Sequence, residues 1–145
     1  MIAALMLALA AQGASAPVAA ERTIVVDARA AARLTQNTGL TVQWLGWERR
    51  GTVSARFDNG VLTLKGRQLS PEDKGSLHLI GVVTRIEKDR FFFKGQIDIR
   101  DTPDAGRECL RDGEYEFRIT GKRRYWRLQE MEVCDGLTDY VDIYF

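Results

Sequence analysis

The stretch FFFKGQIDIR, residues 91–100, decides the fold. From Phe91 to Ile99 every second position is apolar or glycine, and the positions between them carry Phe92 and three polar residues. A period of two describes a β-strand with one dry face and one solvated face. In a helix the same residues would scatter their apolar groups around the axis. We therefore predict a β-strand here and look for partner strands on both sides.

The same rhythm, separated by turn signals, recurs along the rest of the chain. Asn59-Gly60 between two alternating runs predicts a type I′ hairpin turn, because both residues accept a positive φ. The predicted strands cover residues 40–47, 52–58, 61–68, 77–87, 91–100, 114–120, 124–133 and 140–145. Short connections favour antiparallel neighbours. We predict an all-β fold, an eight-stranded antiparallel meander closed as a small barrel, since closure leaves no exposed edges. A two-sheet β-sandwich is the alternative.

Strand phase also predicts which side chains point inward. The set comprises Val53, Phe57, Leu62, Leu64, Leu77, Leu79, Phe91, Phe93, Ile97, Ile99, Tyr115, Phe117, Ile119, Trp126, Leu128, Val141 and Ile143. None of them except Tyr115 is ionisable, whereas enzyme pockets usually hold titratable groups. Eight strands suit either a filled core or a small apolar cavity, and the many aromatics favour a filled core.

Residues 21–39 form an N-terminal segment with a short helix, ahead of a single β-barrel-like domain over residues 40–145. Asp27 follows a β-like run and is a typical N-cap, so the helix is expected over residues 28–34. Asn37 and Gly39 supply its stop. The length of 145 residues suits one such domain.

Residues 1–20 are predicted to be a signal peptide. They carry no charged side chain, and residues 2–11 form an apolar run that is too short to span a bilayer. Val18-Ala19-Ala20 fits signal peptidase and leaves Glu21 as the new N-terminus. The mature protein is therefore expected to be exported, to reside in the periplasm, and not to span the membrane.

Export gives a context for the two cysteines. An even count in an oxidising compartment predicts one disulfide, between Cys109 and Cys134. A CxxC redox pair is absent from the sequence, so oxidoreductase chemistry has no support.

Charge is almost balanced, with 21 basic and 20 acidic residues, which gives no reason to expect nucleic acid as a partner. One basic cluster with aromatics stands out as a candidate binding surface: Lys122, Arg123, Arg124, Tyr125, Trp126 and Arg127. Guanidinium groups beside aromatics suit an acidic envelope protein or another anionic ligand. Trp44 and Trp47 lie three apart in a predicted strand, so one is expected in the core and the other at the surface.

Catalytic and metal motifs are not found. His78, the only histidine, lies on the predicted wet face with no marked nucleophile. Asp135, Asp139 and Asp142 lack the spacing of a calcium loop and are interpreted as turn-forming, solubilising acids. We predict no cofactor and no metal. A non-enzymatic binding protein is the first hypothesis, a lipocalin-like carrier of a small apolar ligand the alternative, and a hydrolase using His78, Asp139 or Asp142 has the least support.

The C-terminal third carries a resemblance. RRYWRLQ, residues 123–129, and CDGLTDYVDIYF, residues 134–145, are similar to the C-terminal signature of a family of small uncharacterised exported bacterial proteins. The resemblance implies export and brings no activity with it. The predicted architecture is also similar to that of periplasmic lysozyme inhibitors and lipocalin-like binders, an analogy of fold alone.

Overall fold

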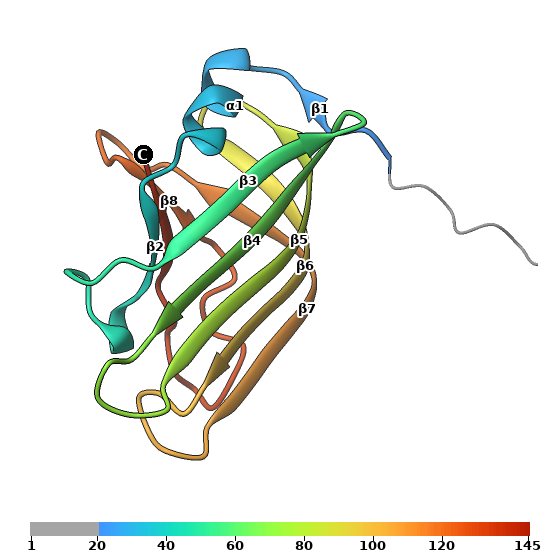
Figure 1. Ribbon diagram of the computed structural model, residues 1–145. Helices are drawn as coiled ribbons and strands as arrows, with labels where there is room; N and C mark the ends of the chain where they lie inside the picture. The colour runs from blue at the N-terminus through green and yellow to red at the C-terminus, as the bar shows by residue number, and fades with distance from the viewer. Residues whose placement is uncertain (1–20) are drawn as a thin grey trace, which may run out of the picture.

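The computed structural model describes residues 21–145 (Figure 1). Its elements in chain order are β1 (Ile24–Val25), α1 (Ala28–Thr35), β2 (Gly39–Val42), a 3₁₀ turn (Gln43–Leu45), β3 (Thr52–Asp58), β4 (Val61–Leu69), β5 (Ser76–Ile86), β6 (Arg90–Arg100), β7 (Glu108–Arg118), β8 (Tyr125–Leu128) and β9 (Val141–Tyr144). The predicted signal peptide, residues 1–20, lies outside the described residues.

The strands form an antiparallel sheet that almost closes on itself. Its order is β2-β9-β8-β7-β6-β5-β4-β3, so nearly every strand pairs with its neighbour in the chain. A bridge between Leu40 and Gly51 joins the two ends of the sheet. The short strand β1 runs parallel to the end of β5. The prediction of an all-β, barrel-like meander is therefore confirmed.

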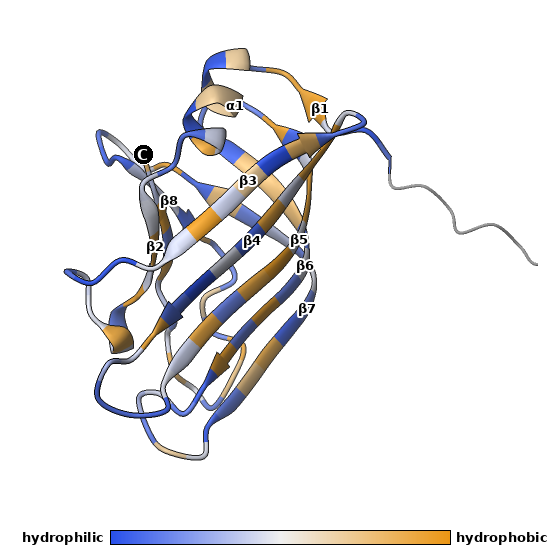
Figure 2. Ribbon diagram, viewed as in Figure 1, coloured by the Kyte–Doolittle hydropathy of each residue, from blue (hydrophilic) through white to orange (hydrophobic). Residues whose placement is uncertain are grey.

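The stretch from which the prediction began forms the middle of this wall. Strand β6 pairs with β5 on one side and with β7 on the other over almost its whole length. Apolar and polar residues alternate along the strands of this wall, as the bands in Figure 2 show. Phe91, Phe93, Ile97 and Ile99 are fully buried on the inner side, which is the phase that the sequence predicted.

The interior is packed with side chains. Phe91, Phe93, Phe117, Trp126 and many leucines and isoleucines of the sheet are at most 1% exposed. Of the predicted inward set, Val53, Tyr115 and Ile119 are only partly buried. The predicted burial of Phe57 is wrong. Its side chain is 45% exposed near the end of β3, which is the last strand of the sheet, so no further strand lies beside it.

Helix α1 lies over one end of the barrel (Figure 1). The carboxylate of Asp27 accepts a hydrogen bond from the Ala30 amide at 2.8 Å, as an N-cap does, and Leu34 is fully buried against the core. Asn37 donates to the Leu34 carbonyl and closes the helix. The predicted cap, helix and stop are all present, and the helix runs one residue further, to Thr35.

Several strand boundaries differ from the prediction. The strand expected over residues 40–47 ends at Val42, because a 3₁₀ turn follows and Gly46 takes a φ of +98°. Strand β7 begins at Glu108, within the predicted loop, and β8 ends at Leu128, within the predicted strand. The pairing of β5 with β6 has one register shift, between Val83 and Arg85.

The Asn59-Gly60 turn matches its prediction. Both residues have positive φ, at 49° and 78°, and they join β3 to β4 in register from Asp58 opposite Val61. Among residues 21–145, no helix has both the length and the apolar character that crossing a bilayer requires.

Candidate functional site

The predicted basic and aromatic cluster is split between the two sides of the barrel wall. Lys122, Arg123 and Arg124 are exposed in the turn before β8. Tyr125 and Arg127 point to the outside of β8. Trp126 points inward and is 1% exposed, so its assignment to the binding surface was wrong. Strand alternation is the reason, since a residue between two outward neighbours faces the core.

Arg127 is the centre of the outer cluster. Its Nε and Nη2 donate to the two carboxylate oxygens of Asp142, at 2.7 and 2.8 Å, from directly opposite on β9. This bidentate arrangement fixes the plane of the guanidinium group. Three rings surround that group, with centroids at 4.3 Å (Tyr140), 5.2 Å (Tyr125) and 5.7 Å (Trp47). Arg127 is thereby held rigidly in an aromatic frame.

A second arginine extends the same face. The guanidinium of Arg50 lies 3.8 Å from the centroid of the Tyr144 ring, and the Tyr144 hydroxyl shares a hydrogen bond of 2.7 Å with Thr41. Burial raises the pKa of this hydroxyl above its usual value. We call this face of β2, β9 and β8 the arginine–aromatic surface, and its members are Trp47, Arg50, Tyr125, Arg127, Tyr140 and Tyr144.

The backbone under this surface is tied down by a glutamine. Gln43 donates to the Thr138 carbonyl at 2.6 Å and accepts from the Tyr140 amide at 2.8 Å. The loop before β9 is thus held to the 3₁₀ turn that leads to Trp47. The rings of Trp47 and Tyr140 lie 6.5 Å apart with a 27° angle between their planes. Two segments nearly 100 residues apart in sequence therefore present one surface.

Asp142 was expected to be a solubilising acid, and this was wrong. Its side chain is 1% exposed beneath Arg127, although it lies on the outer face of β9. Burial raises the pKa of Asp142, and the ion pair with Arg127 offsets only part of that effect.

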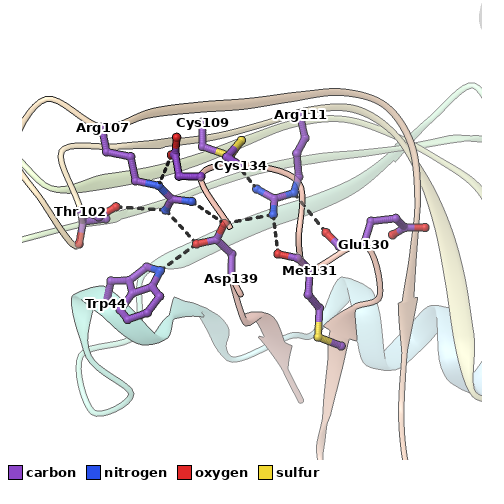
Figure 3. Close-up of a disulfide and its surroundings, with 10 residues drawn as sticks. Trp44, Thr102, Arg107, Cys109, Arg111, Glu130, Met131, Cys134 and Asp139 are labelled. Carbon is purple, nitrogen blue, oxygen red and sulfur yellow. Dashed lines mark hydrogen bonds and ion pairs between the residues drawn. A yellow bond between two sulfur atoms is a disulfide. The ribbon is translucent and has the colours of Figure 1, made fainter. Parts of the chain in front are cut away.

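Asp139 was also expected in solvent, and it is fully buried at the centre of a polar network (Figure 3). Arg107 donates to both of its carboxylate oxygens at 2.9 Å, Arg111 donates to Oδ2 at 3.1 Å, and the Trp44 indole donates to Oδ1 at 2.8 Å. Burial alone would raise the pKa of Asp139, but these hydrogen bonds outweigh it and hold the pKa below its usual value. The interior is therefore less apolar than predicted.

The predicted disulfide is confirmed beside this network. Cys109 on β7 is joined to Cys134 in the loop after β8. Arg111 Nη1 approaches the Cys109 sulfur at 3.1 Å and Nη2 donates to the Met131 carbonyl at 3.0 Å. The bridge and the arginine together anchor the irregular segment between β8 and β9. Of the three acids that were interpreted as solubilising, only Asp135 is exposed, and its carboxylate forms an ion pair with Arg107 at 3.1 Å.

Replacing both cysteines should destabilise this anchor. The bridge closes a loop of 25 residues, and the chain-entropy treatment gives about 3 kcal/mol for that size. We expect Cys109→Ala/Cys134→Ala to lower the free energy of unfolding by about this amount in urea titrations. Reductant should destabilise the wild type and leave the double variant unchanged. Equal stability of oxidised wild type and double variant would contradict the expectation.

His78 and the acids do not converge on a reaction centre. His78 is exposed on the outer face of β5, opposite Arg67 on β4 and Asp98 on β6. Asp139 and Asp142 are both enclosed by arginines. Across residues 21–145 no group of three or more histidine, cysteine, aspartate or glutamate side chains is arranged to hold a metal ion.

The residues that sequence reasoning missed are Arg50, Tyr140 and Tyr144, together with the role of Asp142. Tyr144 and Asp142 alternate with the inward Val141 and Ile143 along β9, so the alternation of side chains in a strand already predicted that both lie on the outer face. Trp47 is 45% exposed and Trp44 binds Asp139, which settles the question that the sequence left open.

Fold and surface together define a small, disulfide-bonded β-barrel whose outer wall carries a rigid cluster of arginine, tyrosine and tryptophan. The PM1083 family matches residues 22–145, and the chain belongs to this family. It is 42% identical over 106 residues to the uncharacterised protein PM1083 of Pasteurella multocida (strain Pm70), across 72% of this chain and 68% of that protein. No solved structure matches. The resemblance to an uncharacterised bacterial family is confirmed.

Proposed function

We propose that this protein is an exported, non-enzymatic binding protein of the cell envelope that recognises an acidic protein partner through the arginine–aromatic surface. The observation that carries the proposal is the frame of Tyr140, Tyr125 and Trp47 around the paired Arg127. Tryptophan, tyrosine and arginine are the residues that dominate binding energy at protein interfaces. Rigid side chains lose little conformational entropy when a partner binds.

Charge supports an anionic partner. Asp142 neutralises Arg127, but Arg50 belongs to the same face, and the exposed turn residues Lys122, Arg123 and Arg124 directly precede Tyr125 at the start of β8. Arg123 and Arg124 lie over the rings of Tyr125 and Phe145, at 5.7 and 5.6 Å from the centroids. A neutral aromatic centre with a cationic rim suits a partner that presents an apolar patch bordered by carboxylates.

The filled interior favours this proposal over a carrier. Trp126, Phe91 and Phe117 are buried where a lumen would have to lie, and Phe91 packs on both other rings, with centroids 5.5 and 5.0 Å away. Three hollows among residues 21–145 are lined mainly by outward-facing strand residues and by loops. Because the interior is filled, a ligand or partner is expected to bind to the outer face of the barrel wall.

Export is supported by the disulfide, since such bonds persist in oxidising compartments. Residues 1–20, whose sequence predicts a signal peptide, precede the described structure at the end where β1 begins.

The test is affinity capture from an envelope extract with matched charge variants. We expect the wild type to retain a partner that Arg123→Glu/Arg124→Glu loses, because reversed charges repel carboxylates. Lys65→Glu/Lys94→Glu changes the net charge equally on the exposed outer faces of β4 and β6, strands that do not belong to this surface, and should retain the same partner. Equal capture by all three proteins, or loss from both variants, would contradict the proposal.

A further inference from the structure

Strand β3 has a free edge, on the wall that the arginine–aromatic surface does not use. It pairs with β4 on one side and is the last strand of the sheet on the other. The bridge from Leu40 to the other end of the sheet lies at Gly51, just before β3 begins. Beyond that bridge the sheet is open along β3. Free strand edges invite pairing with another chain, and natural proteins usually cover them or blunt them.

The hairpin geometry identifies the backbone groups on this edge. In a two-residue type I′ turn, Asp58 and Val61 are hydrogen-bonded to each other, so Val53, Ala55 and Phe57 direct their amides and carbonyls away from β4. One contact confirms this phase: the Leu62 amide, opposite Phe57, donates to the Thr23 hydroxyl at 2.8 Å.

A second contact shows that one group of the edge is already used. Asn37 Nδ2 donates to the Val53 carbonyl at 3.1 Å, close to the end of α1. Further along β3, we find no partner within residues 21–145 for the outward amides of Ala55 and Phe57. Phe57 itself is 45% exposed beside them. The edge thus offers hydrogen-bond donors next to an apolar ring.

A hollow of about 600 Å³ runs along this edge and over the outer face of β3 and β4. Thr35 at the end of α1 and the edge residues Val53 and Ala55 contribute to its lining. Arg56, Lys65, Arg67 and His78 also line it, and no carboxylate of the described residues does. The hollow is therefore cationic on the face toward which alternate side chains of an added strand would point.

From these observations we propose that β3 binds an extended, acidic segment of a partner polypeptide as an additional strand. Its backbone pairs with the outward groups of Ala55 and Phe57, which is the strand-addition mode of peptide recognition. The acidic side chains that point outward from the added strand lie beside Arg56 on β3. They also point toward Lys65 on β4, the next strand of the sheet. Ser54 lies two residues before Arg56 on the same outer face, opposite Lys65, and its small side chain leaves that lysine accessible.

Two synthetic octapeptides test the proposal, one alternating glutamate and valine and one alternating lysine and valine. We expect the glutamate peptide alone to bind in isothermal titration and to shift and protect the Ala55 and Phe57 amides in NMR spectra. Phe57→Pro removes one outward donor without touching the β4 ladder, a position at which an edge strand tolerates proline. It should weaken binding about tenfold, whereas Phe57→Ala, which keeps the amide, should weaken it less.

Charge reversal gives an independent readout should Phe57→Pro fail to fold. Arg56→Glu/Lys65→Glu alters only exposed side chains and should reverse the preference toward the lysine peptide. No binding of the glutamate peptide, or binding that neither variant changes, would overturn the proposal. If free glutamate bound as well as the glutamate peptide, the hollow would be a simple anion site. If the protein self-associated and Phe57→Pro abolished this, the occupant of the edge would be a second copy of the chain. Either result also overturns it.

Discussion

Asp139→Asn is expected to lower the free energy of unfolding by about 3–5 kcal/mol, because it leaves Arg111 buried without a counter-charge and Arg107 with only the exposed Asp135. The side chains of Asp139 and Arg111 are fully buried, and that of Arg107 is 5% exposed. The amide keeps the size of the carboxylate, so packing changes little. Urea denaturation of the purified variant measures the loss, and a change below about 1 kcal/mol would contradict it.

Asp142→Asn is the matched control. Asp142 is equally buried but has one arginine partner, Arg127, which stands at the surface and remains partly solvated when unpaired. We expect a smaller loss than for Asp139→Asn. If the two variants lose the same stability, the account of the Asp139 network is wrong.

The pH dependence of stability should separate the two acids further. The pKa of Asp139 is lowered in the folded state, so its contribution is present above about pH 4, the unfolded value, and is lost as pH falls through the folded pKa. The pKa of Asp142 is raised, so its contribution is present below that value and is lost as pH rises through the folded pKa. Asp139→Asn should therefore remove part of the acid sensitivity of the wild type, and Asp142→Asn should not.

Trp126→Ala is expected to cost about 3–5 kcal/mol, the range for removing a large buried aromatic. Trp126 is 1% exposed, and its ring lies 5.5 Å from Phe91 in an edge-on arrangement and 4.6 Å from Phe145. Trp47→Ala serves as the comparison, since Trp47 is 45% exposed and should change stability by about 0.5 kcal/mol or less. Thermal and urea unfolding of the two variants decide this.

The two tryptophans should show the opposite order in binding. Trp47→Ala removes part of the frame around Arg127 and should weaken partner capture while leaving the fold intact. A Trp126→Ala variant that is stable enough to handle should bind as the wild type does. The reverse order would contradict the assignment of binding to the arginine–aromatic surface.

The fold was predictable because alternation is a local signal. Residues 91–100 set the phase of β6, and Asn59-Gly60 fixed the register of β3 on β4. Phe57 has the predicted phase, but its burial was mispredicted, because alternation says which face a residue lies on and not whether another element covers that face. Closure at Leu40 and Gly51 depends on contacts between the two ends of the sheet, which local patterning does not encode.

The polar network was missed for a different reason. Arg107, Cys109 and Arg111 share the inward phase of Tyr115 and Phe117, but proline and glycine nearby made this segment look like a loop. The sequence did contain one signal of this buried network. Cys109, which was expected to form a disulfide, has an arginine two residues before it and another two residues after it. Charged residues in inward phase are buried when a counter-charge such as Asp139 meets them, and that meeting is a tertiary contact.

Only part of the arginine–aromatic surface could be predicted from the sequence. Tyr125 and Arg127 came from the basic cluster, whereas Trp47 and Tyr140 come from segments that lie far apart in the chain and meet through Gln43. Sequence shows that such residues exist, and only the fold shows that they share a face.

Site-specific photo-crosslinking in the native envelope tests the binding role of this surface most directly. A photoreactive p-benzoylphenylalanine at position 47 should yield a defined adduct, and the same probe at the exposed Leu110 on β7 should not. The adduct should disappear when Arg123→Glu/Arg124→Glu is added. An adduct that survives this charge reversal, or equal adducts from both positions, would contradict the account.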